Sequence, residues 1–212
     1  MKAVILAGSD IRVTDALRER VSDADIVVAA DSGLHHAALL GLTPTLVVGD
    51  FDSVSAEVLG RYENLAEQRH PPEKDRLDLE LAFAEVDERG ADEVVVVGVL
   101  GGRLDQTLAA VVIAARRARE GRTTVLDDGY RQVYLLVGEE GLELPLPPDT
   151  LFSLIALEHN TTVSIQGAKY DLDPTALPFG VGLGVSNRVA TPPLGLRSHG
   201  GLVAVIVEHD VD

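Results

Sequence analysis

The chain has 212 residues, 46% of them hydrophobic, and is long enough to bury one large core or two modest ones. Its formal net charge of −16 argues against non-specific nucleic-acid binding, which needs a basic surface, and any polyphosphate ligand would need metal ions to bridge it to so many carboxylates. The absence of cysteine excludes disulfides and thiolate metal sites and fits a cytoplasmic protein.

The apolar runs are no longer than a strand, far short of the roughly 18 residues that a membrane-spanning helix needs, so no membrane segment is expected. The N-terminal stretch MKAVILAGSD has one lysine and an apolar region too short for a signal peptide, with no cleavage site after it. It is therefore predicted to form the first strand.

Strands and helices are expected to alternate along the first part of the chain. Apolar runs predict strands over 2–7, 25–30, 44–49, 93–100 and 123–126. Apolar periodicity, caps and glycine stops predict helices over 14–21, 34–40, 55–62, 78–89 and 105–119. Residues 67–76 are polar and interrupted by prolines, so they are expected to form a loop. The alternation is typical of an open, doubly wound α/β sheet with mostly parallel strands.

After residue 127 the pattern changes, and no long helix is expected. Short β-type segments are predicted over 132–137, 151–157, 161–165, 182–185 and 202–207. They indicate a small all-β module, a sandwich or a barrel, so the predicted domains are 1–127 and 128–212. The run from Gly180 to Gly184 lacks the strand–helix context of a dinucleotide fingerprint and is interpreted as a glycine-rich turn or bulge.

The stretch LVVGDFDS, residues 46–53, begins as an apolar strand and breaks at Gly49. Alternation places the carboxylates of Asp50 and Asp52 on the same side, while Phe51 turns toward the apolar side. Two carboxylates aligned at a strand end attract a hard divalent cation. The alternative is a polar turn after a buried strand.

Acidic or glycine-rich loops are expected at 31–33, 49–53, 74–78 and 101–106. In an open α/β sheet, the loops at the carboxyl ends of the strands gather along one edge, where ligands bind. Their surplus negative charge would be resolved by bound Mg²⁺, and Lys74 and Arg103 could hold phosphate oxygens. This combination suits metal-assisted transfer of a phosphoryl or diphosphoryl group.

Simpler readings stay open for several of these residues. Asp31 and Asp105 could each cap a helix, Lys74 could be a solvated loop lysine, and 101–102 could be only a tight turn. No metal role is expected for His35 and His36, which are adjacent on a predicted helix, and His70 of the proline-containing loop is not included among the site residues. The sequence contains no Walker A motif, no G-x-S-x-G motif and no cysteine nucleophile, which excludes P-loop kinases and the corresponding hydrolases.

Several motifs, in this order, closely resemble the thiamine pyrophosphokinase family. They are AADSG, PTLVVGDFDS, EKD-x-x-D-x-E-x-A and GGRLDQT in the first part of the chain, then FSLIAL, GAKYDL and GVSN. The resemblance covers essentially the whole chain, and GDFDS together with GGRLDQ is its most specific part.

The resemblance implies transfer of diphosphate from ATP to the hydroxyethyl oxygen of thiamine, giving thiamine diphosphate and AMP, with Mg²⁺. It implies an N-terminal α/β catalytic domain and a C-terminal β-sandwich. It also implies a homodimer in which thiamine lies between the catalytic domain of one subunit and the sandwich of the other.

Carried over by motif, the metal-binding and catalytic carboxylates are Asp50, Asp52 and Asp78. The residues expected to contact nucleotide, phosphate or thiamine are Asp31, Lys74, Asp75, Arg103, Asp105, Gln106, Ser186 and Asn187.

The chain departs from the family pattern at Ser32, where glycine is usual, and at Leu77, where threonine is common. The turn 7–10 also lacks the frequent glycine-rich pair, and there is no tryptophan to stack on thiamine. Two alternative functions stay open. One is a related pyrophosphokinase acting on another alcohol, such as a hydroxymethylpterin, and the other is a non-catalytic sensor of thiamine diphosphate or nucleotide.

Overall fold

The computed structural model describes residues 1–49, 54, 56–62, 65–69 and 76–209. Its contacts divide the chain into two compact units, Met1–Ile113 with Arg122–Gly129, and Ala114–Gly121 with Tyr130–Asp212. Helix α5 (Leu104–Arg119) therefore contributes to both units. The domain boundary placed after Asp127 stays a prediction.

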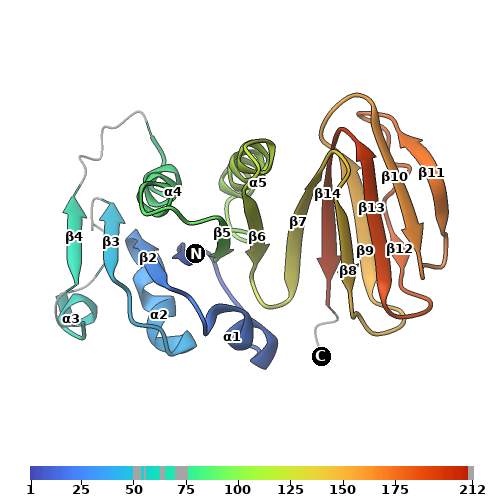
Figure 1. Cartoon of the computed structure of the whole chain (residues 1–212). Helices are drawn as coiled ribbons and strands as arrows, with labels where there is room; N and C mark the ends of the chain where they lie inside the picture. Colours follow the sequence, from blue (N-terminus) through green and yellow to red (C-terminus); the bar gives the residue numbers. More distant parts are fainter. Residues whose placement is uncertain (50–53, 55, 63–64, 70–75, 210–212) are drawn as a thin grey trace. The chain divides into compact units, whose positions relative to one another are not determined.

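The first unit contains a parallel sheet with the strand order β6–β5–β1–β2–β3–β4 (Figure 1). Near-continuous apolar runs form its inner strands because both faces are covered. The strands are β1 (Lys2–Leu6), β2 (Ile26–Ala30), β3 (Leu46–Gly49), β4 (Ala66–Arg69), β5 (Glu93–Val97) and β6 (Thr123–Asp127).

Helices cover both faces of this sheet, with α1 and α2 on one face and α4 and α5 on the other (Figure 1). Besides α5, the helices are α1 (Asp15–Val21), α2 (Leu34–Leu40), α3 (Ala56–Leu59), α4 (Asp78–Glu88) and the 3₁₀ turn η1 (Asp31–Gly33). The apolar positions that predicted α4 are all buried: Leu79, Ala82, Phe83 and Val86. The predicted doubly wound α/β unit is confirmed. None of the described helices is long and apolar enough to cross a membrane.

Three local predictions in this unit need correction. Strand β4 forms at the start of the stretch 67–76 that was expected to be a loop, because an edge strand pairs with one neighbour only and tolerates a polar sequence. Helix α3 is shorter than the predicted 55–62, and its expected cap, Ser55, lies outside the described residues. Strand β5 ends at Val97, because Gly98 turns the backbone to φ +81°.

Two glycines let neighbouring loops press against the end of β1. A Cβ atom on Gly33 would overlap the backbone carbonyl of Leu6, and a Cβ atom on Gly98 would overlap the carbonyl of Ala7. Only a residue without a side chain allows these approaches. The loops after β2 and β5 are therefore drawn together at the carboxyl end of β1.

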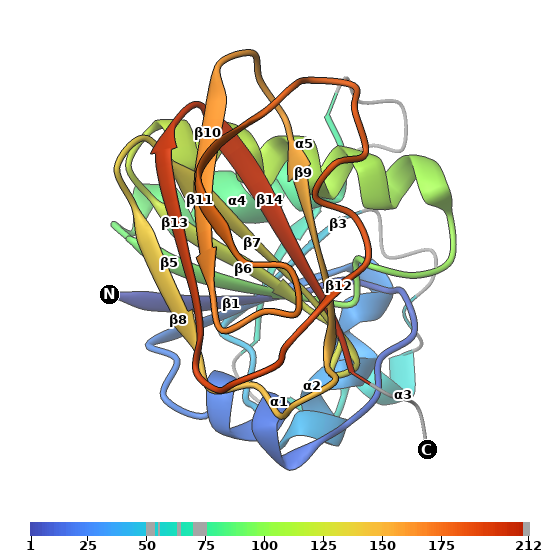
Figure 2. The ribbon, with the colours of Figure 1, turned by 90° about the vertical axis from the view of Figure 1, so that its right-hand side faces the viewer.

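The second unit contains two antiparallel sheets, ordered β7–β14–β9–β12 and β11–β10–β13–β8 (Figures 1 and 2). Both sheets contribute to one apolar interior, which includes Leu136, Leu154, Val163, Leu196 and Val203. The predicted β-sandwich is confirmed. Its strands are β7 (Arg131–Val137), β8 (Gly141–Leu144), β9 (Leu151–Ala156), β10 (Thr161–Gln166), β11 (Leu172–Leu177), β12 (Asn187–Arg188), β13 (Leu194–Gly200) and β14 (Leu202–Glu208).

Strands β8, β11, β12 and β13 were not predicted from the sequence. The first three lie at sheet edges, where polar residues and proline are tolerated, and β13 contains glycines that weaken the strand pattern. The strand predicted over 182–185 is wrong, since these residues form a turn. The interpretation of the glycine-rich run as a turn is the correct one.

Candidate active site

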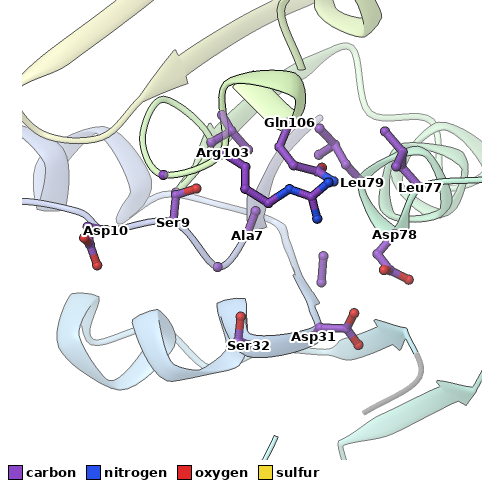
Figure 3. A pocket seen from close by; sticks show the side chains of 15 residues that line it. Ala7, Ser9, Asp10, Asp31, Ser32, Leu77, Asp78, Leu79, Arg103 and Gln106 are labelled. Atoms are coloured by element: carbon purple, nitrogen blue, oxygen red, sulfur yellow. The ribbon is translucent and has the colours of Figure 1, made fainter. Parts of the chain in front are cut away.

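A cavity of about 450 Å³ lies in the first unit, where the loops after β1, β2 and β5 meet the start of α4. The strand order reverses between β1 and β5, and the crevice at such a switch point is where open α/β sheets bind ligands. The cavity is lined by Ala7, Gly8, Ser9, Asp10, Ala30, Asp31, Ser32, Leu77, Asp78, Leu79, Gly98, Val99, Gly102, Arg103 and Gln106 (Figure 3).

Asp31 enters the cavity directly after β2, from a left-handed backbone with φ +43°. This conformation is uncommon for a residue with a side chain, and strained residues of this kind cluster at functional sites. The Asp31 carboxylate lies against the backbone of Gly49, because a Cβ atom there would overlap it. Asp31 therefore lies beside the strand end that leads into Asp50. Asp50 and Asp52 themselves lie outside the described residues.

Asp78 lines the cavity from the first turn of α4. The side chain of Glu80 accepts a hydrogen bond from the backbone N–H of Leu77 (3.1 Å), which fixes this turn. Leu77, one of the departures from the family pattern, also lines the cavity. Lys74 and Asp75 lie outside the described residues.

Arg103 and Gln106 reach the cavity from the start of α5, and Figure 3 shows them on the side opposite Asp31. The Arg103 guanidinium also holds Asp105 through two bonds, Nη2 to Oδ2 (2.6 Å) and Nε to Oδ1 (3.1 Å). This hydrogen bonding and the attraction of opposite charges raise the pKa of Arg103 and lower the pKa of Asp105. Asp105 does not line the cavity itself, and its link to the site is its bonding to Arg103.

Ser9, Asp10 and Ser32 also line the cavity, although the sequence pointed to the turn 7–10 and to Ser32 only as departures from the family pattern. Ser9 and Asp10 follow β1, and the Ser9 hydroxyl donates to the carbonyl of Gly101 (2.8 Å), which ties the first loop to the loop after β5. Ser32 fills the space beside Gly8, where a Cβ atom would overlap its hydroxyl. The position of Asp10 after the carboxyl end of a predicted strand was the available signal that it lines the cavity.

His36 on α2 supports the loop that contains Ser9. Its Nε2–H donates to the Ser9 backbone carbonyl (2.9 Å), while its Nδ1 is buried and has no hydrogen-bond partner within the described part of the chain. Burial lowers the pKa of His36 more than the bond to Ser9 raises it. The neutral imidazole is therefore the form that the folded protein accommodates.

Ser186 and Asn187 belong to the second unit. Ser186 is exposed and has a left-handed backbone with φ +64°. The Asn187 amide is buried and bonds the backbone of Tyr170 in both directions, donating to its carbonyl (2.8 Å) and accepting from its N–H (3.2 Å). Asn187 thus holds the turn that presents Tyr170.

The described residues contain no group of three or more His, Cys, Asp or Glu side chains close enough together to hold a metal ion. Asp31 and Asp78 line the cavity, however, and their carboxylate oxygens are the ligands that Mg²⁺ prefers. Beside them lies one arginine, suited to phosphate oxygens. This donor set fits a hard cation bound together with a phosphorylated ligand.

Family models match both parts of the chain. Residues 17–126 match the model described as "Thiamin pyrophosphokinase, catalytic domain", and residues 142–194 match "Thiamin pyrophosphokinase, vitamin B1 binding domain". The first match alone spans the cavity-lining residues from Ala30 to Gln106.

Individual proteins agree with these matches. The chain is 28% identical to thiamin pyrophosphokinase 1 of Caenorhabditis elegans, over 76% of this chain and 68% of that protein. It is 25% identical to thiamine pyrophosphokinase of Bacillus subtilis, over 89% and 90%. Its fold matches the crystal structure of the Bacillus subtilis enzyme with a TM-score of 0.84 at 20% identity, over 100% of both chains.

The half-buried imidazole of His36 predicts that the stability of the fold depends on pH. The folded-state pKa of His36 lies below the unfolded value of 6.5. The free energy of unfolding is therefore undiminished above pH 6.5, and it falls as the pH drops from 6.5 through the lower folded-state pKa. We expect His36→Gln to reduce the loss of melting temperature between pH 8 and the onset of acid unfolding. His35→Gln, which changes the exposed neighbour, should change that loss much less. Equal slopes for wild type and His36→Gln would contradict this account.

Proposed function

The chain belongs to the thiamin pyrophosphokinase family and is a thiamine diphosphokinase, and we propose that it takes the diphosphate from ATP in the cavity formed by the loops after β1, β2 and β5. The observation that carries this proposal is the meeting of Asp31, Asp78, Arg103 and Gln106 on one cavity at the switch point of the sheet. They come from motifs that are distant in sequence.

In the proposed reaction, the hydroxyethyl oxygen of thiamine attacks the β-phosphorus of ATP. The new O–P bond forms while the bond between the β-phosphorus and the oxygen of AMP breaks, and the hydroxyl proton passes to a nearby carboxylate or to water. The products are thiamine diphosphate and AMP. Because the alcohol is a poor nucleophile, positioning and charge neutralisation must supply most of the acceleration.

The acidic side of the cavity is proposed to hold Mg²⁺. Asp31 and Asp78 would provide oxygen ligands, together with Asp50 and Asp52 of the motif that follows β3. The ion would neutralise charge on the transferred diphosphate. Lys74 and Asp75 are proposed to contact the phosphates, on the basis of the sequence motif alone.

Arg103 and Gln106 are proposed to hold phosphate oxygens. A guanidinium has five N–H donors, and the Arg103–Asp105 pair uses Nε and Nη2, so donors stay available for a phosphate. The two bonds to Asp105 favour one orientation of the guanidinium before the nucleotide arrives. This arrangement reduces the side-chain entropy lost on binding.

Ser186 is proposed to border the thiamine site in the second unit. Asn187 would act indirectly, by holding the turn of Tyr170 through both of its amide atoms.

A homodimer is proposed from an exposed apolar segment of the second unit. Phe179, Val181, Leu183 and Val185 alternate with glycines in the turn before β12, and each is about half exposed, at 53%, 57%, 56% and 49%. Four exposed apolar side chains within one short segment are unusual on a monomer and typical of an interaction site. A second copy of the chain is the proposed partner.

The function is tested by incubating the purified protein with Mg²⁺, ATP and thiamine and detecting thiamine diphosphate and AMP. Asp78→Asn should lower kcat by at least about 100-fold, equivalent to about 3 kcal/mol, because it removes a cavity carboxylate. Asp87→Asn is the matched control, since Asp87 lies on the same helix but pairs with Arg122 (2.6 Å). Product formation with a hydroxymethylpterin instead of thiamine, or undiminished turnover by Asp78→Asn, would overturn the proposal.

The dimer is tested by light scattering after size-exclusion chromatography. Leu183→Asp should raise the dimer dissociation constant at least about tenfold, because it places a charge in a desolvated contact. Leu39→Asp, at a residue 52% exposed on α2, should leave the dimer intact. A monomeric wild-type protein, or equal masses for all three proteins, would contradict the proposed interface.

A further inference from the structure

Asp128 is a buried carboxylate directly after β6, outside the cavity lining and unused by the proposed mechanism. Its residue exposure is 0%. Its Oδ1 accepts hydrogen bonds from the backbone N–H groups of Gly98 (2.9 Å) and Val99 (3.2 Å), and its Oδ2 accepts one from Leu100 (2.8 Å). One side chain thus binds three consecutive amides of the loop that leaves β5.

We propose that Asp128 is a positioning residue for the nucleotide, acting through the backbone of the loop 98–102; this inference rests on the proposed function. A buried carboxylate is strongly unfavourable unless hydrogen bonds compensate for its lost hydration. The three amides provide that compensation, and the carboxylate in turn satisfies amides that a turn at a strand end would otherwise leave without acceptors.

The neighbouring residue, Asp127, is also a buried aspartate, but its bonds to Arg20 and Gly129 do not involve the loop after β5. Asp127 is 1% exposed, but it pairs with Arg20 on α1 (Nε to Oδ2, 2.8 Å) and accepts from the N–H of Gly129 (2.8 Å). The two adjacent carboxylates therefore secure different parts of the unit. Asp127 fixes the turn after β6 to α1, and Asp128 fixes the loop after β5.

The loop that Asp128 holds leads directly to the phosphate-binding residues. Gly98, Val99 and Gly102 line the cavity, and Arg103 and Gln106 follow at the start of α5. Further bonds secure the same loop, from the Ser9 hydroxyl to the Gly101 carbonyl (2.8 Å) and from the Thr107 hydroxyl to the Val99 carbonyl (3.0 Å). A shift of its first residues would therefore move the groups proposed to contact the phosphates.

The bonding also assigns roles within the loop. The amides of residues 98–100 are directed to Asp128, so they are not the groups that bind phosphate, unlike the amides of many glycine-rich loops. Phosphate recognition is left to the residues after them, with Arg103 foremost. Loss of the Asp128 carboxylate should consequently weaken the binding of the nucleotide and leave the binding of thiamine unchanged.

The decisive variant is Asp128→Asn. An amide has one acceptor oxygen, and its NH₂ group would face at least one loop N–H, so a bond is replaced by a donor–donor contact. We expect the KM for ATP to rise at least about tenfold, with the KM for thiamine within about twofold of wild type. Amides 98–100 should also exchange with deuterium faster. Asp127→Asn, the control for an equally buried carboxylate, should alter neither the KM for ATP nor that exchange.

A double-mutant cycle separates positioning from general destabilisation. If Asp128 acts through the placement of Arg103, the Asp128→Asn change should reduce kcat/KM for ATP much less in an Arg103→Ala background than in wild type. Fully additive losses would overturn the proposal. So would equal KM effects of Asp128→Asn and Asp127→Asn.

A second pair of variants covers the case in which Asp128→Asn does not fold. Thr107→Val removes the hydroxyl bond to the same loop, and Thr107→Ser keeps it. A rise in the KM for ATP with valine and its rescue with serine would support the inference, and no difference between the two would overturn it.

A wild-type protein that makes no thiamine diphosphate would contradict the proposed function instead. The exchange of amides 98–100 would still test Asp128 in that case.

Discussion

The candidate site depends on how closely the loops after β2 and β5 approach the end of β1. Glycines at 8, 33 and 98 allow this approach, because a Cβ atom at each would overlap Ser32, Leu6 or Ala7, respectively. Parallel strands bring their carboxyl ends to one edge of the sheet. The loops after β1, β2 and β5 form one continuous lining only because they are in direct contact, which the glycines allow. The cavity and the placement of Asp31 depend on this contact, and side-chain bonds from Asp128, Ser9 and Thr107 secure the 98–102 loop.

The charges around the cavity suggest how an acidic protein manages a polyphosphate. Asp31 and Asp78 would repel ATP, while Arg103 attracts it and is already oriented by Asp105. A divalent cation between the carboxylates and the phosphates removes that repulsion. The buried Asp128 does not line the cavity, and its oxygens accept hydrogen bonds from the backbone amides of residues 98–100.

Much of the architecture follows from simple patterns. Apolar runs and helical periodicity predicted β5 and α4 because those elements are buried on well-defined faces. Asp78 and Arg103 could be placed in one site because carboxyl ends of parallel strands converge. The polar edge strand β4 escaped prediction because it pairs on one side only. Asp128 escaped because an Asp-Asp-Gly sequence is typical of an exposed turn, and its burial depends on a loop that is distant in sequence.

The proposed reaction requires the cavity at the switch point to bind the triphosphate of ATP. A crystal structure with Mg²⁺, thiamine and α,β-methylene ATP, whose carbon bridge replaces the oxygen at the bond to be broken, tests it most directly. We expect phosphate oxygens within hydrogen-bond distance of Arg103 and Gln106, and Mg²⁺ on the side of Asp31 and Asp78. A triphosphate bound outside this cavity, with Arg103 contacting only Asp105, would contradict it.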